Sequence, residues 1–467
     1  MNARGSIAIG LSGMAGLAGL ALVGACTFSS EISVHSHELL KPLPGGLVNS
    51  YNVEEKLDLG FVPEVLEYLL GSGKSTLEKT RASRLLGRAL LERGDFRAAH
   101  PYLERAYAQE GRFSLRADTA WFLSQCDTWS GHFVEAARWA RIAQSDGRRI
   151  PDGWIAFLLS GAERTLYGGS VAGTRLQAPM TFGNPDLVRL SVRVNETPED
   201  LMVLDSGASI SLLTESAARQ FAIDIVPDAT AGAFGLHNVE IPLRFGWART
   251  VQVGGATLTN VPFGILPDEA LSFHTSSSGK FHFAGVLGAH FMKEFDWRLG
   301  YRERMIQGVR LEPSIVRGSK QQNLFFRRLK PMIRASFNQE PWFLFLFDTG
   351  SEPTMVTRTG LNKARTKDLE SNYPMTLEGI GQSRVSWGKM SNATVGIDRY
   401  MVRFKDIVVK EESSGIEDGV LGSSFLSHFD VEIRFGTMTV TLESPLDRLQ
   451  RQEGAQEPAL FPRAPRS

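Results

Sequence analysis

The stretch LMVLDSGAS (residues 201–209) decides the fold, because a closely similar stretch, LFLFDTGSE, occurs at residues 344–352. In each copy an apolar run leads into an aspartate, a hydroxyl residue and a glycine. The two aspartates, Asp205 and Asp348, lie 143 positions apart. An apolar run that ends at such a triplet predicts a buried β-strand followed by a tight turn.

The sequence before each stretch is repeated as well. LSVRVN (residues 190–195) and IRASFN (residues 333–338) both alternate apolar and polar residues and end in asparagine. Ten positions separate this asparagine from the aspartate in both copies. Both units therefore predict a hairpin of the same length that delivers an aspartate at the end of a strand.

A second pair of motifs follows in the same order. GVLGAHF (residues 285–291) matches GVLGSSF (residues 419–425), and Phe-Asp follows in both copies. Gly288 and Gly422 lie 134 positions apart, so the first unit contains nine more residues between its two motifs. Two pairs in the same order with matching flanks predict a duplicated β-unit.

These paired motifs resemble those of the retropepsin-like aspartic proteases. The resemblance implies an all-β, two-lobed pepsin/retropepsin-like domain, with lobe 1 at residues 176–315 and lobe 2 at residues 316–445. It implies Asp205 and Asp348 as the catalytic pair. Around this pair it implies hydroxyls that brace the two lobes, glycines that allow tight turns, and glycines packed behind each loop: Ser206 and Thr349, Gly207 and Gly350, Gly288 and Gly422.

The family also closes β-hairpin flaps over its substrate. Glycine-rich segments lie between the paired motifs of each unit, where flaps should be. The flap candidates are Gly232, Phe234 and Gly235 in the first unit, and Gly379 and Gly381 in the second.

The residue types fit hydrolysis of a peptide bond. Two buried carboxyls brought together cannot both ionise cheaply, so they share one proton. One carboxylate then activates a water while its protonated partner polarises the substrate carbonyl. We expect an aspartic endopeptidase that acts on an extended peptide or protein segment without a cofactor or metal. The alternatives are a non-catalytic peptide-binding module and an assembly scaffold with a degenerate protease fold.

A helical pattern precedes the β-region. Residues 59–148 show apolar residues three and four apart, and Gly94-Asp95 and Gly131-His132 mark turns between helices. The spacing of small residues around these turns resembles tetratricopeptide repeats. Such an all-α domain is either a platform for a protein partner or a helical cap packed on the rest of the chain.

The N-terminus predicts the compartment. Residues 1–25 contain Arg4, an apolar glycine-rich run and small residues before Cys26, the pattern of a secretory signal. This segment resembles a bacterial lipoprotein signal peptide, which implies lipidation of Cys26. We expect a lipid-anchored, periplasm-facing envelope protein, with the outer membrane favoured because Thr27 is not an aspartate. The alternative is a signal anchor with an incidental cysteine.

Composition excludes several other classes. The chain of 467 residues has 51 basic and 51 acidic side chains, so no surplus of positive charge favours nucleic-acid binding. Two cysteines exclude a disulfide scaffold, and nine histidines show no metal-binding spacing. The remaining segments are expected to be a tether (26–58), a linker (149–175) and a disordered tail (446–467).

Overall fold

The computed structural model describes most of the chain. It covers residues 47–71, 77–182, 187–234, 240–275, 279–312, 321–364, 370–378, 385–410, 417–445 and 447, with the backbone of 22–23 and 30–34. The segment expected to be a signal peptide is outside this part except for strand β1 (Leu22–Val23), and Cys26 is outside it entirely. None of the helices in the described ranges is long and apolar enough to cross a lipid bilayer.

The N-terminal region is helical, as the periodicity predicted. Its helices are α1 (Val53–Asp58), α2 (Val62–Leu70), α3 (Lys79–Glu92), α4 (Phe96–Gln109), α5 (Phe113–Ser130), α6 (Phe133–Ser145) and α7 (Asp152–Ser160). The predicted turns are confirmed: Gly94 has φ +83° and Asp95 caps α4, while Gly131 ends α5 with φ +80°. These left-handed angles favour glycine. Whether the helical hairpins are tetratricopeptide repeats stays a prediction.

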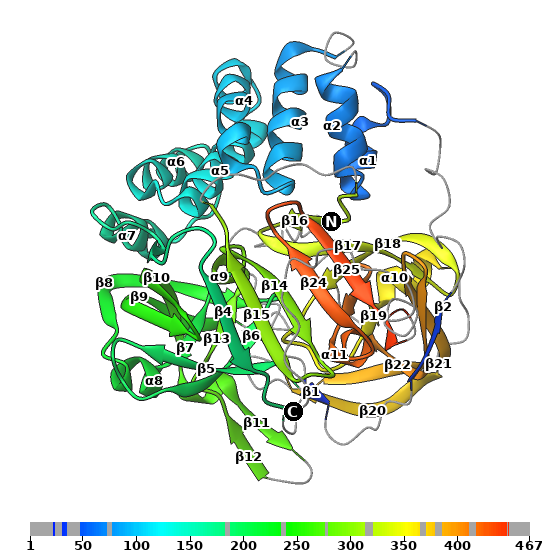
Figure 1. Cartoon of the computed structure of the whole chain (residues 1–467). Coiled ribbons are helices and arrows are strands. Elements are labelled where there is room, and N and C mark those ends of the chain that lie inside the picture. The colour runs from blue at the N-terminus through cyan, green and yellow to red at the C-terminus, as the bar shows by residue number, and fades with distance from the viewer. Residues whose placement is uncertain are drawn as a thin grey trace, which may run out of the picture.

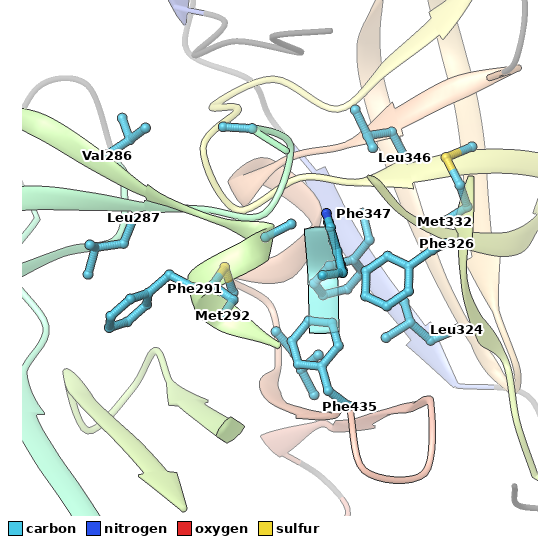
Figure 2. Close-up of a cluster of buried hydrophobic side chains, with 14 of the residues drawn as sticks. Val286, Leu287, Phe291, Met292, Leu324, Phe326, Met332, Leu346, Phe347 and Phe435 are labelled. Carbon is cyan, nitrogen blue, oxygen red and sulfur yellow. The ribbon is translucent and has the colours of Figure 1, made fainter. Parts of the chain in front are cut away.

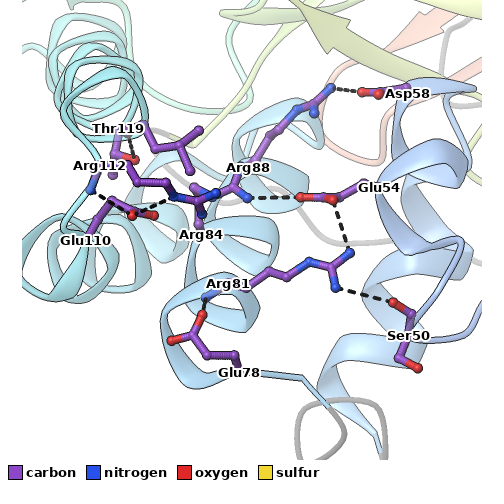
Figure 3. A network of polar contacts seen from close by, with 11 residues as sticks. Ser50, Glu54, Asp58, Glu78, Arg81, Arg84, Arg88, Glu110, Arg112 and Thr119 are labelled. Carbon is purple, nitrogen blue, oxygen red and sulfur yellow. Dashed lines mark hydrogen bonds and ion pairs between the residues drawn. The ribbon is translucent and has the colours of Figure 1, made fainter.

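Ion pairs join the first helices. Arg81 and Arg84 on α3 each donate to the Glu54 carboxylate of α1, at 3.0 and 2.9 Å. One turn further along α3, Arg88 donates to Asp58 at 2.6 Å (Figure 3). The spacing of three and four residues places all three guanidinium groups on the same side of α3.

The β-region forms two lobes with the same order of elements. Lobe 1 contains β4 (Arg175–Pro179), β5 (Arg189–Val194), β6 (Asp200–Asp205), β7 (Leu212–Thr214), α8 (Glu215–Gln220), β8 (Asp224–Phe234), β9 (Glu240–Val253), β10 (Ala256–Leu266), β13 (Gly285–Gly288), α9 (Ala289–Met292), β14 (Phe295–Gly300) and β15 (Met305–Arg310). Short β3 (Gly168–Gly169) pairs with β10. Lobe 2 contains β16 (Leu324–Arg327), β17 (Lys330–Phe337), β18 (Glu340–Phe347), β19 (Met355–Thr357), α10 (Arg358–Lys363), β20 (Glu370–Glu378), β21 (Val385–Ile397), β22 (Tyr400–Lys410), β23 (Gly419–Leu421), α11 (Ser423–Leu426), β24 (Asp430–Arg434) and β25 (Thr439–Glu443). The predicted two-lobed all-β arrangement is confirmed.

The first hairpin of each lobe has the same turn. Asn195 and Glu196 have φ +49° and +63°, and Asn338 and Gln339 have φ +47° and +65°. Two consecutive positive φ angles are typical of the tight turns that match the twist of a hairpin, and asparagine tolerates them. This turn fixes the ten-residue distance to each aspartate.

The longer spacing in lobe 1 comes from an insertion after β10. This insertion contains a 3₁₀ helix (Asp268–Leu271) and the hairpin of β11 (Ser272–Thr275) and β12 (Gly279–His282). The corresponding connection in lobe 2, between β22 and β23, has no such hairpin in its described residues.

A shared sheet and a shared core hold the lobes together. In the five-stranded sheet β25-β24-β14-β15-β4, β14 of lobe 1 pairs antiparallel with β24 of lobe 2. Figure 2 shows apolar side chains of β13 and α9, such as Leu287 and Met292, on one side of the core. Side chains of β16 to β18, such as Phe326 and Phe347, fill the other side.

The helical region packs on both lobes (Figure 1). On lobe 1, the Phe157 ring of α7 stacks on Trp247 of β9 with centroids 5.0 Å apart. On lobe 2, Trp129 of α5 meets Phe326 of β16 edge to face at 5.0 Å. These buried contacts favour the interpretation of the helices as a cap.

Three expected segment boundaries differ from the structure. Helix α1 and strand β2 (Ser30–Val34), which pairs with β22, fall in the expected tether. Helix α7 falls in the expected linker. Its amphipathic periodicity is weak, and burial of its aromatic side chains against lobe 1 stabilises it instead. In the expected tail, Asp447 is buried and accepts a hydrogen bond from the Ser444 amide at 2.9 Å.

Candidate active site

The two aspartates lie where their strands end. Asp205 is the last residue of β6, and Asp348 directly follows β18. Each strand pairs in parallel with the second motif strand of its own lobe, β13 or β23, which fixes the strand end in the interior. Their exposed fractions are 0% and 2%, so both carboxyls are buried.

The structure brings the two carboxyls together across the lobes. The two carboxyls lie close enough for the charge of Asp205 to act directly on Asp348. A Cβ atom built on Gly207 would lie 2.3 Å from Asp348 Oδ2, and one built on Gly350 would lie 2.3 Å from Asp205 Cγ. Each lobe therefore needs a glycine at this point, because any side chain would displace the aspartate of the other lobe.

Backbone amides orient each carboxyl. The amides of Gly207 and Ala208 donate to Asp205 Oδ1 at 2.9 and 3.1 Å. The Gly350 amide donates to Asp348 Oδ1 at 2.9 Å. Asp205 Oδ1 accepts its two bonds next to Gly350 of the other lobe, whereas Asp205 Oδ2 is buried and accepts no hydrogen bond from the residues that the structure describes.

Ser206 and Thr349 brace the two lobes reciprocally. The Ser206 hydroxyl donates to the Phe347 carbonyl at 2.6 Å and accepts from the Thr349 amide at 3.0 Å. In the same way the Thr349 hydroxyl donates to the Leu204 carbonyl at 2.6 Å and accepts from the Ser206 amide at 3.0 Å. Four buried hydrogen bonds thus fix the position of one aspartate relative to the other.

Gly288 and Gly422 lie behind the two loops. A Cβ on Gly288 would come within 2.4 Å of the Ile210 carbonyl oxygen, and one on Gly422 within 2.3 Å of the Pro353 carbonyl oxygen. Both contacts are shorter than atoms tolerate. The backbone of each lobe approaches its own active loop so closely that only glycine fits.

Sequence reasoning missed two hydroxyls beside these glycines. The Gly288 amide donates to the Ser211 hydroxyl at 3.1 Å, and the Gly422 amide donates to the Thr354 hydroxyl, also at 3.1 Å. Ser211 and Thr354 lie 143 positions apart, the same distance as the two aspartates. That equal offset was the signal that could have identified them.

The flap candidates are placed only in part. Gly232 and Phe234 lie at the end of β8, which forms a long hairpin with β9. Gly235 follows β8 and lies outside the described residues, as do Gly379 and Gly381, which follow β20. Strands β20 and β21 form the equivalent hairpin of lobe 2. The assignment of these residues to flaps stays a prediction.

Burial and mutual repulsion set the charge of the pair. Burial raises the pKa of Asp205 to about 6, against an ordinary value of 3.8. Burial, and then the negative charge of Asp205, raise the pKa of Asp348 well above its ordinary value. The pair can therefore keep one proton at pH values where isolated carboxyls have lost theirs.

Sequence reasoning also missed Lys330, at the start of β17. Its ammonium interacts electrostatically with both Asp348 and Asp205, and favours their charged forms. Counting back from the turn of the β17–β18 hairpin places Lys330 opposite Phe347, and only the β-bulge in this hairpin shifts it opposite Asp348. In the described part of the chain, no group of three or more His, Cys, Asp or Glu side chains could hold a metal ion.

Comparison with known proteins agrees with the site. Residues 190–291, from β5 through α9, match the aspartyl protease family. Among solved structures, the aspartic proteinase from Irpex lacteus is similar with 11% sequence identity and a TM-score of 0.34, over 58% of this chain and 97% of that chain. No curated protein sequence matches the chain. The family match covers lobe 1 and lobe 2 repeats its strand order, so the chain fits a helical region followed by a two-lobed, pepsin/retropepsin-like fold.

Proposed function

We propose that the protein is an aspartic endopeptidase that hydrolyses extended peptide segments held between its lobes. One observation carries the proposal: two buried aspartates, one from each copy of a duplicated unit, lie side by side where the lobes meet and interact with each other. The family match and the amide and hydroxyl hydrogen bonds around the pair support it.

The reaction needs only water and the two carboxyls. The ionised member of the pair accepts a proton from the water, whose oxygen attacks the scissile carbonyl. The protonated member donates a hydrogen bond to that carbonyl oxygen as it gains negative charge. The tetrahedral intermediate then collapses, the C–N bond breaks, and the leaving amine takes a proton from the pair. Because the pair titrates as a unit, neither role is assigned to one aspartate.

The substrate is best held as an additional strand. In this proposal the β8–β9 and β20–β21 hairpins close over an extended peptide and hydrogen-bond its backbone. Backbone pairing gives affinity for many sequences, and side-chain pockets beside the pair select among them.

Two single substitutions test the proposal. Asp205→Asn and Asp348→Asn should each reduce peptide cleavage at least about 1,000-fold, because one remaining carboxyl cannot serve both roles. Asp200→Asn, at the other end of β6, is the matched control and should retain cleavage. The measurement is turnover of a mixed peptide library from acidic to neutral pH, with thermal unfolding as the check on folding.

The outcomes separate the alternatives. Full cleavage by either active-site variant would reject the two-aspartate mechanism. Binding of peptides by the wild type without cleavage at any pH would instead support a non-catalytic peptide-binding module.

We also propose, from the sequence alone, that Cys26 is lipidated and that the protein faces the periplasm, in the outer membrane rather than the inner one. Cells grown with an alkyne-labelled fatty acid should label the wild type and not Cys26→Ala. Recovery of unlabelled wild type, or of labelled Cys26→Ala, would contradict lipidation at this residue.

A protein partner for the helical region remains a further proposal. Because Trp129 and Phe157 face the lobes, such a partner would have to bind the outer side of the helices. Phe113, which is 71% exposed at the start of α5, lies on that accessible surface. Phe113→Asp should then abolish capture of the partner without lowering the melting temperature, and unchanged capture would exclude this surface.

A further inference from the structure

The two aspartates have different neighbours. Lys330 begins β17, and in this strand Met332 pairs with Leu346 of β18. Two residues further along the same antiparallel register, Lys330 falls opposite Asp348. Its ammonium makes no hydrogen bond with the residues that the structure describes, and it interacts electrostatically with both aspartates.

Lys330 belongs to a buried charged cluster. Lys410 ends β22 and Glu417 precedes β23, and both interact electrostatically with Lys330. All three side chains are 8% exposed. Arg327 donates to Glu92, away from the cluster, whereas Arg328 interacts with Glu417 from an exposed position. The buried members of the cluster, two lysines and one glutamate, carry one surplus positive charge beside the pair.

The equivalent positions of lobe 1 are apolar. Leu187 lies 143 positions before Lys330. In lobe 1, Leu266 pairs with Thr214 of β7. In lobe 2, Lys410 pairs with Thr357 of β19, which is the counterpart of Thr214, so Leu266 is the counterpart of Lys410. The Thr214 amide donates to the carbonyl of residue 284, and the Thr357 amide donates to the carbonyl of residue 418, so residues 284 and 418 are counterparts. The residues just before them, Phe283 and Glu417, are therefore counterparts as well.

These three apolar side chains are also buried, with exposed fractions of at most 3%. At these three positions lobe 1 therefore has apolar side chains and lobe 2 has charged ones. Lobe 1 also has a buried cation, Arg189, whose guanidinium lies over the Phe283 ring at 5.8 Å. The charged cluster of lobe 2 is buried, so its side chains are not placed to contact a substrate at the surface. Its effect on the aspartates is therefore electrostatic.

We propose that Lys330 is a positioning residue for the active site, which stabilises the single negative charge shared by Asp205 and Asp348. The inference rests on the proposed function and extends it. A buried cation strengthens the ionised form of a neighbouring carboxyl, because the interior screens charge poorly. Without it, burial and repulsion would keep the pair fully protonated to a higher pH, and no carboxylate would be available to activate water.

The cost of burying the lysine is consistent with this role. Burial lowers the pKa of Lys330 to about 8, and the attraction of Glu417 and the two aspartates opposes the shift. Lys330 is therefore charged at neutral pH and below, where the pair must hold one proton. Above about pH 8 it loses its charge and its influence on the pair.

Neutral and charged substitutions of Lys330 test the proposal. Lys330→Met keeps the length of the side chain without its charge, Lys330→Leu copies the residue of lobe 1, and Lys330→Arg keeps the charge. The first measurement is a ¹³C NMR titration of the aspartate carboxyl carbons, with Asp205→Asn and Asp348→Asn used to assign the pair. The second is the pH profile of kcat/KM on a cleaved peptide.

Removal of the charge should raise the apparent pKa values of the pair by about one unit, and the acidic limb of kcat/KM should move up equally. Lys330→Arg should titrate as the wild type does. The wild-type and Lys330→Met profiles should converge above about pH 8.

The proposal is overturned if a folded neutral variant titrates as the wild type does, or if Lys330→Arg shifts as far as Lys330→Met. The NMR titration does not depend on cleavage. If the wild type cleaves no peptide, the proposed function fails while the titration still decides the role of Lys330. If the wild type cleaves and the titration is unchanged by the neutral variants, only the role of Lys330 fails.

Discussion

The two lobes have the same elements in the same order, yet they differ in several features outside the point where they meet. Both deliver an aspartate, a hydroxyl residue and a glycine to the point where the lobes touch. They differ in the hairpin β11–β12, in the side chains around the aspartates, and in how they bind the helices. The parts that contact their own copy must be alike, because each hydrogen bond there is made twice.

Attachment to the helical region shows the difference most plainly. Lobe 1 binds α7 through stacked aromatic rings, including Trp247. Lobe 2 uses Arg327, whose guanidinium donates to the carbonyls of Leu57 and Asp58 at 2.6 Å and to Glu92 at 2.9 Å. Both lobes bind the helices through aromatic rings, and lobe 2 adds a buried ion pair with carbonyl contacts.

The sharpest way to break the equivalence of the lobes is to change one central glycine. Gly207→Ala and Gly350→Ala each place a methyl group 2.3 Å from the aspartate of the other lobe, so each should reduce cleavage at least about 100-fold. Equal losses are expected because the contact is symmetric. The measurement is kcat/KM on a peptide substrate, with Gly111→Ala as the control because its methyl group would meet nothing within 4 Å. Wild-type activity in either variant would show that the carboxyls do not meet as described.

A second experiment sharpens the comparison of the two attachments. Arg327→Met removes a donor from the carbonyls of Leu57 and Asp58 and removes one ion pair of the buried Glu92, so the free energy of unfolding should fall by about 4 kcal/mol. Arg434→Met, which removes a partly exposed pair with Glu432 in the same lobe, should cost less than about 1 kcal/mol. Denaturant unfolding measures both. A loss below about 1 kcal/mol for Arg327→Met would mean that the aromatic contacts alone hold the helices.

The third experiment uses pH and has the smallest expected effect. The folded pKa of Asp205 is about 6 and its ordinary value is 3.8, so the folded state keeps a proton that the unfolded state releases first. The resulting stabilisation is complete below about pH 4 and is lost as the pH rises through about 6. Over that range the unfolding free energy of the wild type should fall by about 3 kcal/mol relative to Asp205→Asn.

Taking this difference cancels groups with the opposite sign, such as Glu294, whose pKa is lowered by Lys293 and Arg310 against its burial. The measurement is denaturant unfolding of both proteins at several pH values. A difference that stays constant from pH 4 to 7 would mean that Asp205 is not perturbed.

Much of the site could be predicted from the sequence because it is repeated. The aspartates, the neighbouring hydroxyls and the four glycines were found by matching the two copies, and the structure places all of them around one point. Lys330 was missed for the same reason: its counterpart is Leu187, so comparison of the copies does not draw attention to it. Helix α7 was missed because its stability comes from Trp247 and Phe245, which are far away in the sequence.

The sequence by itself determined two β-units, their hairpins and the strand ends that carry the aspartates, because alternation, turn residues and glycine requirements are local. Only the tertiary structure decided that the carboxyls meet, that a charged cluster lies beside one of them, and that the helices pack on both lobes. Those features depend on contacts between residues more than 100 positions apart, such as the bond from the Ser206 amide to the Thr349 hydroxyl. Local pattern has no information about such contacts, whereas burial and pairing of charges in a common interior select them.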